Sequence, residues 1–199
     1  MIDSVRNLRR GEGIRLTKGV GTVLLTAGEI CERIRGLGRE VARDYQAEVP
    51  VLVGLLRGGF IFQCDLGRAA QIPQEFDFLQ VSRFNPTEKG RTAVKVLHDL
   101  RSDVRGRHVL VIEGIRTRSA KLEYVQRFLQ LREPASLRFA ALVRQTGARE
   151  LPVPLQYLGF EIGDDFVIGC GLDYEERYRN LPVIATFVPT ATGETARVA

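Results

Sequence analysis

The sequence predicts an α/β fold in which a parallel sheet is flanked by helices. Residues 51–56 form an apolar run, followed by a glycine-containing turn at 57–59 and a helical pattern over 60–70. Residues 109–112 form a second apolar run, followed by a polar loop and an amphipathic pattern over 121–131. Strand–turn–helix units in series are typical of parallel sheets, because a helix must return the chain to the start of the next strand.

The elements before and between these units are expected in a regular order. A short strand is expected at residues 23–25, and Thr26 with Glu29 forms a capping-box pattern that begins a helix ending near Tyr45. Residues 75–81 and 93–97 predict the two strands of a long hairpin. Further strands are expected at 137–143, 155–160, 166–170 and 183–187.

The composition is that of an ordinary globular chain with a surplus of basic residues. The chain has 199 residues, and 29 Lys and Arg residues face 24 Asp and Glu residues, which gives a net charge of +5. We expect a basic arm over residues 1–21, one domain over 22–189 and a flexible tail over 190–199. The basic surplus favours an anionic ligand or a nucleic-acid contact.

Several classes of protein are not favoured by the sequence. No apolar run approaches the roughly 18–20 residues that cross a bilayer, and the first residues lack the apolar core of an export signal. Cys31, Cys64 and Cys170 are widely spaced and form no CxxC pair. We therefore expect reduced thiols in a cytoplasmic protein, without a membrane partner or a zinc site.

The stretch VLVIEGIRTRSAKL, residues 109–122, has the pattern of an anion site. Its strand is expected to end at Glu113 and Gly114 and to lead through a polar loop into a helix. Such a junction points backbone N–H groups at whatever lies above the strand tip, a geometry that binds phosphate. Arg116, Arg118 and Lys121 add positive charge, but no carboxylate follows Glu113.

Three stretches together resemble the type I phosphoribosyltransferases, and within them the hypoxanthine-guanine branch. LLRGGF, residues 55–60, resembles the pyrophosphate-binding LKGG loop, and residues 108–122 resemble the motif that usually reads VLIVEDIIDTGxTL. Residues 157–182 follow YVGFEIPDxFVVGYGLDYxExYRNLP almost position for position. The resemblance implies a parallel sheet with a hood, and it runs from about residue 23 to residue 189.

The resemblance implies a purine salvage activity. Members of this family transfer ribose 5-phosphate from phosphoribosyl diphosphate to a 6-oxopurine and release pyrophosphate, with Mg²⁺ as cofactor. The implied partners are therefore phosphoribosyl diphosphate and a purine base or nucleotide, with a second copy of the chain in a homodimer or homotetramer.

The resemblance also assigns site residues. It implies phosphate or pyrophosphate contacts for Leu56, Arg57, Gly58, Arg116, Thr117, Arg118, Ser119, Ala120, Lys121 and Arg179. It implies purine contacts for Gln145, Phe166, Val167 and Asp173, catalysis by Glu113 with Thr117 at the base position, and metal binding by Glu113 and Asp173.

The chain departs from the family pattern at the positions that have catalytic and ligand-binding roles in the family. Gly114 replaces the second acid, Thr117 replaces the Asp that acts as general base, and Ser119 replaces the loop glycine. Gln145 stands in place of the Lys that reads the purine 6-oxo group, and Arg57 in place of the loop Lys. A threonine hydroxyl has no useful basicity near pH 7, so catalysis is expected to be impaired or altered.

Other interpretations remain open at this point. The chain could be a non-catalytic, regulatory descendant that binds a nucleotide or another phosphorylated ligand. A weaker alternative is nucleic-acid binding through the basic arm and the loop. Individual residues also have structural alternatives: Phe166 as core, Asp173 with Arg179 as a structural ion pair, Glu113 as a cap, and Arg116, Arg118 and Lys121 as a solvated helix start.

Overall fold

The computed structural model describes residues 19–84, 93–116, 121–146 and 153–189. Within these residues a six-stranded sheet has the order β4-β3-β2-β5-β6-β7. All its neighbouring strands are parallel except β3 and β4, which form the expected hairpin at one edge. The strands are β2 (Val51–Leu56), β3 (Glu75–Phe84), β4 (Ala93–His98), β5 (His108–Arg116), β6 (Ser136–Gln145) and β7 (Tyr157–Ile162).

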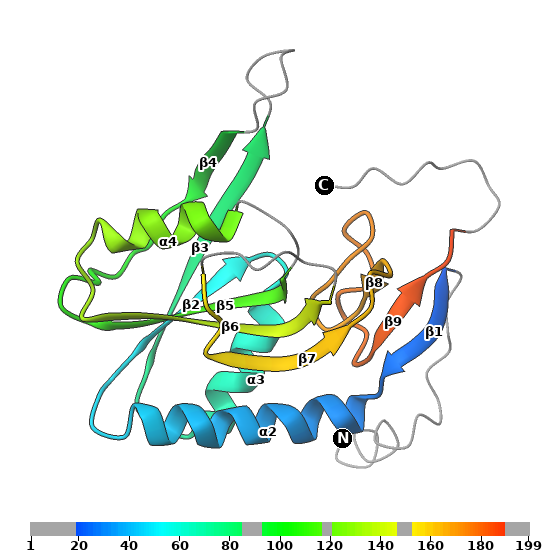
Figure 1. The fold of residues 1–199 in the computed structure, drawn as a ribbon, viewed down its shortest axis with the longest axis horizontal. Helices are drawn as coiled ribbons and strands as arrows, with labels where there is room; N and C mark the ends of the chain where they lie inside the picture. Colours follow the sequence, from blue (N-terminus) through cyan, green and yellow to red (C-terminus); the bar gives the residue numbers. More distant parts are fainter. Residues whose placement is uncertain (1–18, 85–92, 117–120, 147–152, 190–199) are drawn as a thin grey trace.

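Helices cover both faces of this sheet, as Figure 1 shows. The helices α2 (Ala27–Asp44) and α3 (Phe60–Ala70) lie on one face, and α4 (Lys121–Gln130) lies on the other. Side chains of β5 alternate between two cores: Leu110 packs with α2 and α3, whereas Val111 packs with α4. Burial on both faces explains why the central strands read as uninterrupted apolar runs.

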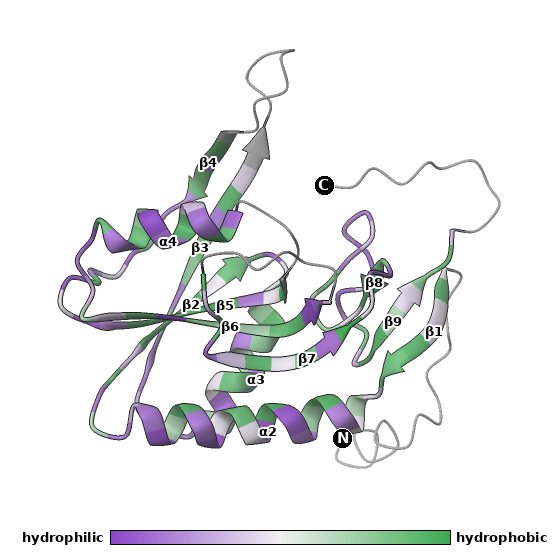
Figure 2. Ribbon diagram, in the orientation of Figure 1, coloured by the Kyte–Doolittle hydropathy of each residue, from purple (hydrophilic) through white to green (hydrophobic). Residues whose placement is uncertain are grey.

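The N-terminus of α2 confirms the predicted capping box. The Thr26 backbone N–H donates to Glu29 Oε2 at 2.8 Å, and the Glu29 backbone N–H donates to Thr26 Oγ1 at 3.3 Å. Buried residues Ile30, Ile34 and Leu37 follow at helical spacing. Figure 2 shows the resulting alternation of apolar and polar residues along this helix.

A small second sheet forms the expected hood. The strands β1 (Val20–Leu25), β9 (Ile184–Phe187) and β8 (Val167–Ile168) are antiparallel and have the order β1-β9-β8. Segments from the two ends of the chain therefore lie side by side, near the arrowheads of β6 and β7 (Figure 1). Leu25 is followed at once by the N-cap of α2, which connects the hood to the body of the domain.

Several predicted strand boundaries are wrong. The strand β5 does not end at Glu113 and Gly114 but continues to Arg116, because its ladder with β6 continues through Ile115 and Val143. The strand β8 has two residues instead of the five expected, because Gly169, with φ +103°, turns the chain directly after Ile168. The start of β7 at Tyr157, two residues later than predicted, is a smaller shift of the same kind.

Some predictions fall outside the described residues. These are most of the arm at 1–21, the tail at 190–199 and the loop residues Thr117, Arg118, Ser119 and Ala120. Val20 and Gly21, which the sequence analysis assigned to the arm, belong to β1. Among the described residues, no helix has the length and apolar character needed to cross a membrane.

Candidate functional site

Three chain segments meet at the carboxyl ends of the central strands. They are the loop after β2, the end of β5, and the loop over residues 169–181, which we call the hood loop. A Cβ added at Gly114 would lie 2.4 Å from the Gly58 carbonyl oxygen, and a Cβ added at Gly171 would also lie 2.4 Å from it. The backbones approach so closely here that only glycine fits. The Leu56–Arg57 peptide bond in this loop is cis.

Gly114 therefore has a packing role that sequence reasoning missed. The sequence pattern predicts only the loss of an acid at this position. In the structure, any side chain at position 114 would displace the Gly58 carbonyl or the Leu172 side chain, whose Cδ2 would lie 3.0 Å from the added Cβ. No signal in the sequence alone could have paired glycines that lie 56 residues apart or more.

Glu113 is the one acidic site residue buried in the sheet. Its exposed fraction is 6%, and its Oε2 lies 2.7 Å from Lys121 Nζ at the start of α4. Lys121, which the sequence analysis assigned to phosphate, thus faces a carboxylate in this structure. The pair joins β5 to the beginning of α4.

Two arginines converge on the acidic hood loop. Arg57 Nη1 lies 2.9 Å from Glu176 Oε2, and Arg179 Nη2 lies 2.8 Å from the same oxygen. Arg179 Nη1 also contacts Asp173 Oδ1 at 2.8 Å and donates to the Gly171 carbonyl at 2.7 Å. The hydrogen bond from Arg179 and the positive charges of both arginines hold the pKa of Glu176 below its usual value.

This cluster confirms one of the structural alternatives and adds one residue to the candidate site. Asp173 and Arg179, for which a structural ion pair was considered, are indeed paired. Glu176 was not singled out from the sequence. The available signal was its place between two expected site residues, Asp173 (purine and metal) and Arg179 (pyrophosphate), in the stretch that carries the resemblance.

The expected purine side lies at the hood. Phe166 is 44% exposed, and its ring meets Tyr174 and Phe187 edge-on at centroid distances of 6.0 and 6.1 Å. Its exposure excludes the alternative of a core residue and leaves ring surface on which a planar base can stack. Val167 is buried and pairs with Thr186 of β9.

Gln145 is connected to the residue before this ring. Its Nε2 donates to the Asp165 carbonyl oxygen at 3.1 Å, directly before Phe166 in the chain. The amide can also donate a second hydrogen bond, but unlike the lysine of the family pattern it carries no charge. The structure thus connects Gln145 to the residue directly before Phe166, while the side chain of Arg116 and the whole of Thr117 lie outside what it describes.

The described residues do not fit a metal held by the protein. Glu113 is paired with Lys121, and Asp173 with Arg179, so each candidate carboxylate already faces a cation. Nowhere in the described ranges do three or more His, Cys, Asp or Glu side chains gather as ligands. A Mg²⁺ ion is commonly bound through substrate phosphates with only one or two carboxylates, so it can enter with a diphosphate substrate.

Known proteins resemble this chain in both sequence and fold. A family model described as the phosphoribosyl transferase domain matches residues 22–175. The chain belongs to this family. Hypoxanthine phosphoribosyltransferase of Salmonella typhimurium is 42% identical over 168 residues, which cover 83% of this chain and 94% of the relative.

Two further members of the family extend the similarity. Hypoxanthine-guanine phosphoribosyltransferase of Mycobacterium avium is 42% identical over 176 residues, covering 85% of this chain and 87% of the relative. A crystal structure of a hypoxanthine phosphoribosyltransferase from Staphylococcus aureus matches with a TM-score of 0.82 at 34% identity, covering 88% of this chain and 96% of that one. The family recognised from three stretches of sequence is confirmed, as is the fold that it implied.

Proposed function

We propose that this protein binds a 6-oxopurine nucleotide between the hood and the strand tips, and that it transfers ribose 5-phosphate from phosphoribosyl diphosphate to the base at a much reduced rate. The observation that carries the proposal is the exposed Phe166 ring, with the Gln145 amide hydrogen-bonded to the residue directly before it. A flat hydrogen-bonding ligand suits this pair, because the ring offers stacking surface and the amide a directed donor. The names of the relatives support purine chemistry.

The reduced rate follows from the residues that would handle protons and ribose. Thr117 stands at the base position and Gly114 at the second acid position of the resembling motif. Loss of a general base typically costs about 10²–10⁴ in rate. Glu113, the remaining acid, is buried and paired with Lys121, so a ribose hydroxyl must compete with an ammonium group for it.

A direct assay tests this function. The full chain is mixed with hypoxanthine or guanine and the magnesium salt of phosphoribosyl diphosphate, and formation of the monophosphate is followed. We expect slow turnover that Phe166→Ala abolishes. Thr117→Asp, which restores a carboxylate at the base position, should raise the rate by about 10²–10⁴. Binding of inosine monophosphate without turnover, in both the unmodified chain and Thr117→Asp, would contradict the enzymatic proposal.

The second candidate is a non-catalytic nucleotide-binding regulator. The Glu113–Lys121 pair specifically favours it, because this pair neutralises the acid that the reaction would use. The same assay distinguishes the two functions, since the regulator binds inosine monophosphate but makes none.

The cellular location, the metal cofactor and the oligomeric state are proposed on separate grounds. Cys31 and Cys64 are exposed free thiols, and free thiols persist in a reducing compartment, which favours the cytoplasm. We propose that magnesium enters as the substrate complex and that the chain forms a homodimer or homotetramer like those implied by the resemblance. Light scattering of the purified chain tests the oligomer.

A further inference from the structure

The carboxylate of Glu176 lies between two arginines from different parts of the chain. Its Oε2 is 2.9 Å from Arg57 Nη1, in the loop after β2, and 2.8 Å from Arg179 Nη2, in the hood loop. Two guanidinium groups that converge on one oxygen form a seat for an anion. In this structure the anion in the seat is a side chain of the protein itself.

The two arginines are held very differently. Arg179 is only 18% exposed, and the Gly171 carbonyl and Asp173 fix its Nη1. Arg57 and Glu176 are each 56% exposed, so their contact is open to water and to competing ions. Exposed ion pairs contribute little free energy. A multivalent anion with several oxygens can therefore replace Glu176 while Arg179 stays in place.

The backbone around this carboxylate has an unusual conformation. Glu175, Glu176 and Tyr178 have φ values of +50°, +63° and +73°, in the left-handed region that residues other than glycine rarely adopt. Such conformations persist only where the surrounding structure determines them, and they concentrate at ligand clamps and switches.

We propose that Glu176 is an internal competitor that occupies the anion seat between Arg57 and Arg179, and that a diphosphate ligand binds by displacing it. The diphosphate class follows from the two guanidinium groups, which can each take oxygens of a different phosphoryl group. This inference rests on the proposed function in one respect, namely that the site receives a phosphorylated ligand.

Binding of inorganic pyrophosphate to the full chain, measured by isothermal titration calorimetry, tests the displacement. Glu176→Gln removes the competing charge and should lower the Kd for pyrophosphate roughly 3–30-fold, because the ion pairs of Glu176 with Arg57 and Arg179 no longer have to be broken. Glu175→Gln is the matched control. It removes the same charge from the adjacent, exposed position, whose side chain forms no ion pair with the described residues, and it should change the Kd less than about 2-fold.

The Arg57→Gln variant tests whether Glu176 affects pyrophosphate binding through the seat between the two arginines. In Arg57→Gln, pyrophosphate should bind more weakly, and adding Glu176→Gln should recover less than it gains in the unmodified chain. An unchanged or raised Kd in Glu176→Gln overturns the proposal, because Glu176 would then only orient the arginines. Absence of pyrophosphate binding in both the unmodified chain and Glu176→Gln also overturns it. Inosine monophosphate is titrated in parallel, so failure of the seat and failure of the proposed function give different results.

Discussion

At the scale of single residues, the ion pair between Lys121 and Glu113 contributes to the stability of the candidate site. Lys121→Met leaves the Glu113 carboxylate buried without its cation, so we expect the free energy of unfolding to fall by about 1–3 kcal/mol. Urea denaturation at pH 7 measures this change.

The partner substitution provides the control for this pair. Glu113→Gln in the Lys121→Met background removes the unpaired charge and should recover part of the lost stability. Strict additivity of the two substitutions would show that the observed pair contributes nothing to stability.

Alanine substitutions at two glycines, Gly114 and Gly36, should change the free energy of unfolding in opposite directions. Gly114→Ala places a methyl group 2.4 Å from the Gly58 carbonyl and should lower the free energy of unfolding by about 1–3 kcal/mol. Gly36→Ala is the control: it lies inside α2, its added Cβ meets nothing closer than 3.7 Å, and it should raise stability by about 0.5–1 kcal/mol. Thermal unfolding followed by circular dichroism measures both, and equal effects would contradict the packing role.

Only part of this site could be predicted from the sequence. Arg57 and Phe166 could be assigned to the candidate site because each lies in a stretch that resembles the family continuously, whereas Gln145 was assigned from its place between two such stretches. The contact of Gly58 with Gly114 and Gly171 could not be predicted, because it depends on how three distant segments approach one another. The pairing of Lys121 with Glu113 was missed for a related reason: β5 runs on beyond its apolar core before α4 begins.

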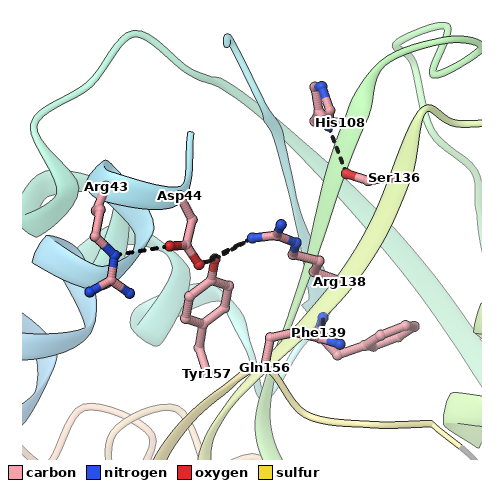
Figure 3. Close-up of polar contacts among 8 residues, drawn as sticks. All are labelled: Arg43, Asp44, His108, Ser136, Arg138, Phe139, Gln156 and Tyr157. Atoms are coloured by element: carbon pink, nitrogen blue, oxygen red, sulfur yellow. Dashed lines mark hydrogen bonds and ion pairs between the residues drawn. The ribbon is translucent and has the colours of Figure 1, made fainter. Parts of the chain in front are cut away.

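A polar cluster at the opposite end of the strands connects several elements. Tyr157 is the first residue of β7, and its hydroxyl donates to Asp44 Oδ2, at the C-terminus of α2, over 2.8 Å. Arg138 of β6 lies 3.1 Å from the same oxygen (Figure 3). The cluster joins α2 to two strands at their amino-terminal side, away from the candidate site.

The pH dependence of stability should report on this cluster. Burial alone would raise the pKa of Asp44, but the hydrogen bonds from Tyr157 and Arg43 and the charges of Arg43 and Arg138 outweigh it and lower the pKa. A carboxylate whose pKa is lowered on folding stabilises the fold at pH values above its pKa in the unfolded chain, which is near 3.9. This stabilisation is lost as the pH falls through the pKa of the folded state.

Asp44→Asn tests this sign. The variant should be less stable by about 1–2 kcal/mol at pH 7, and the difference from the unmodified chain should shrink below about pH 3. Asp65→Asn, in an exposed pair with Arg68 on α3, is the control and should cost less than about 0.5 kcal/mol at either pH. Urea denaturation at pH 7 and pH 3 measures both. A difference that is the same at both pH values would contradict the assignment to the Asp44 carboxylate.

Elements were easier to predict than their ends. The apolar runs of β2 and β5 and the capping box of α2 act locally, so sequence alone located them. The ends of β5 and β8 depended on tertiary features, a continued ladder with β6 in one case and a turn at Gly169 in the other.

At the scale of the whole molecule, the fold separates stability from ligand binding. Two cores lie on the two faces of the central sheet, while the hood contributes Phe166 as an exposed ring. A ligand that bridges the hood and the strand tips would therefore add contacts that the unliganded protein lacks. Binding to the folded state alone stabilises a protein by about 2.7 kcal/mol at 100 times the Kd.

Inosine monophosphate should accordingly raise the Tm of the full chain by about 5–10 °C at 100 times its Kd. Phe166→Ala should abolish this shift, since it removes the stacking surface, while Phe76→Ala should preserve it. Phe76 is the matched control because it is 43% exposed, against 44% for Phe166, but lies near the amino end of β3. Differential scanning fluorimetry with and without ligand gives both values. Loss of the shift in both variants would mean that general destabilisation is responsible, and retention in Phe166→Ala would remove this ring from the ligand site.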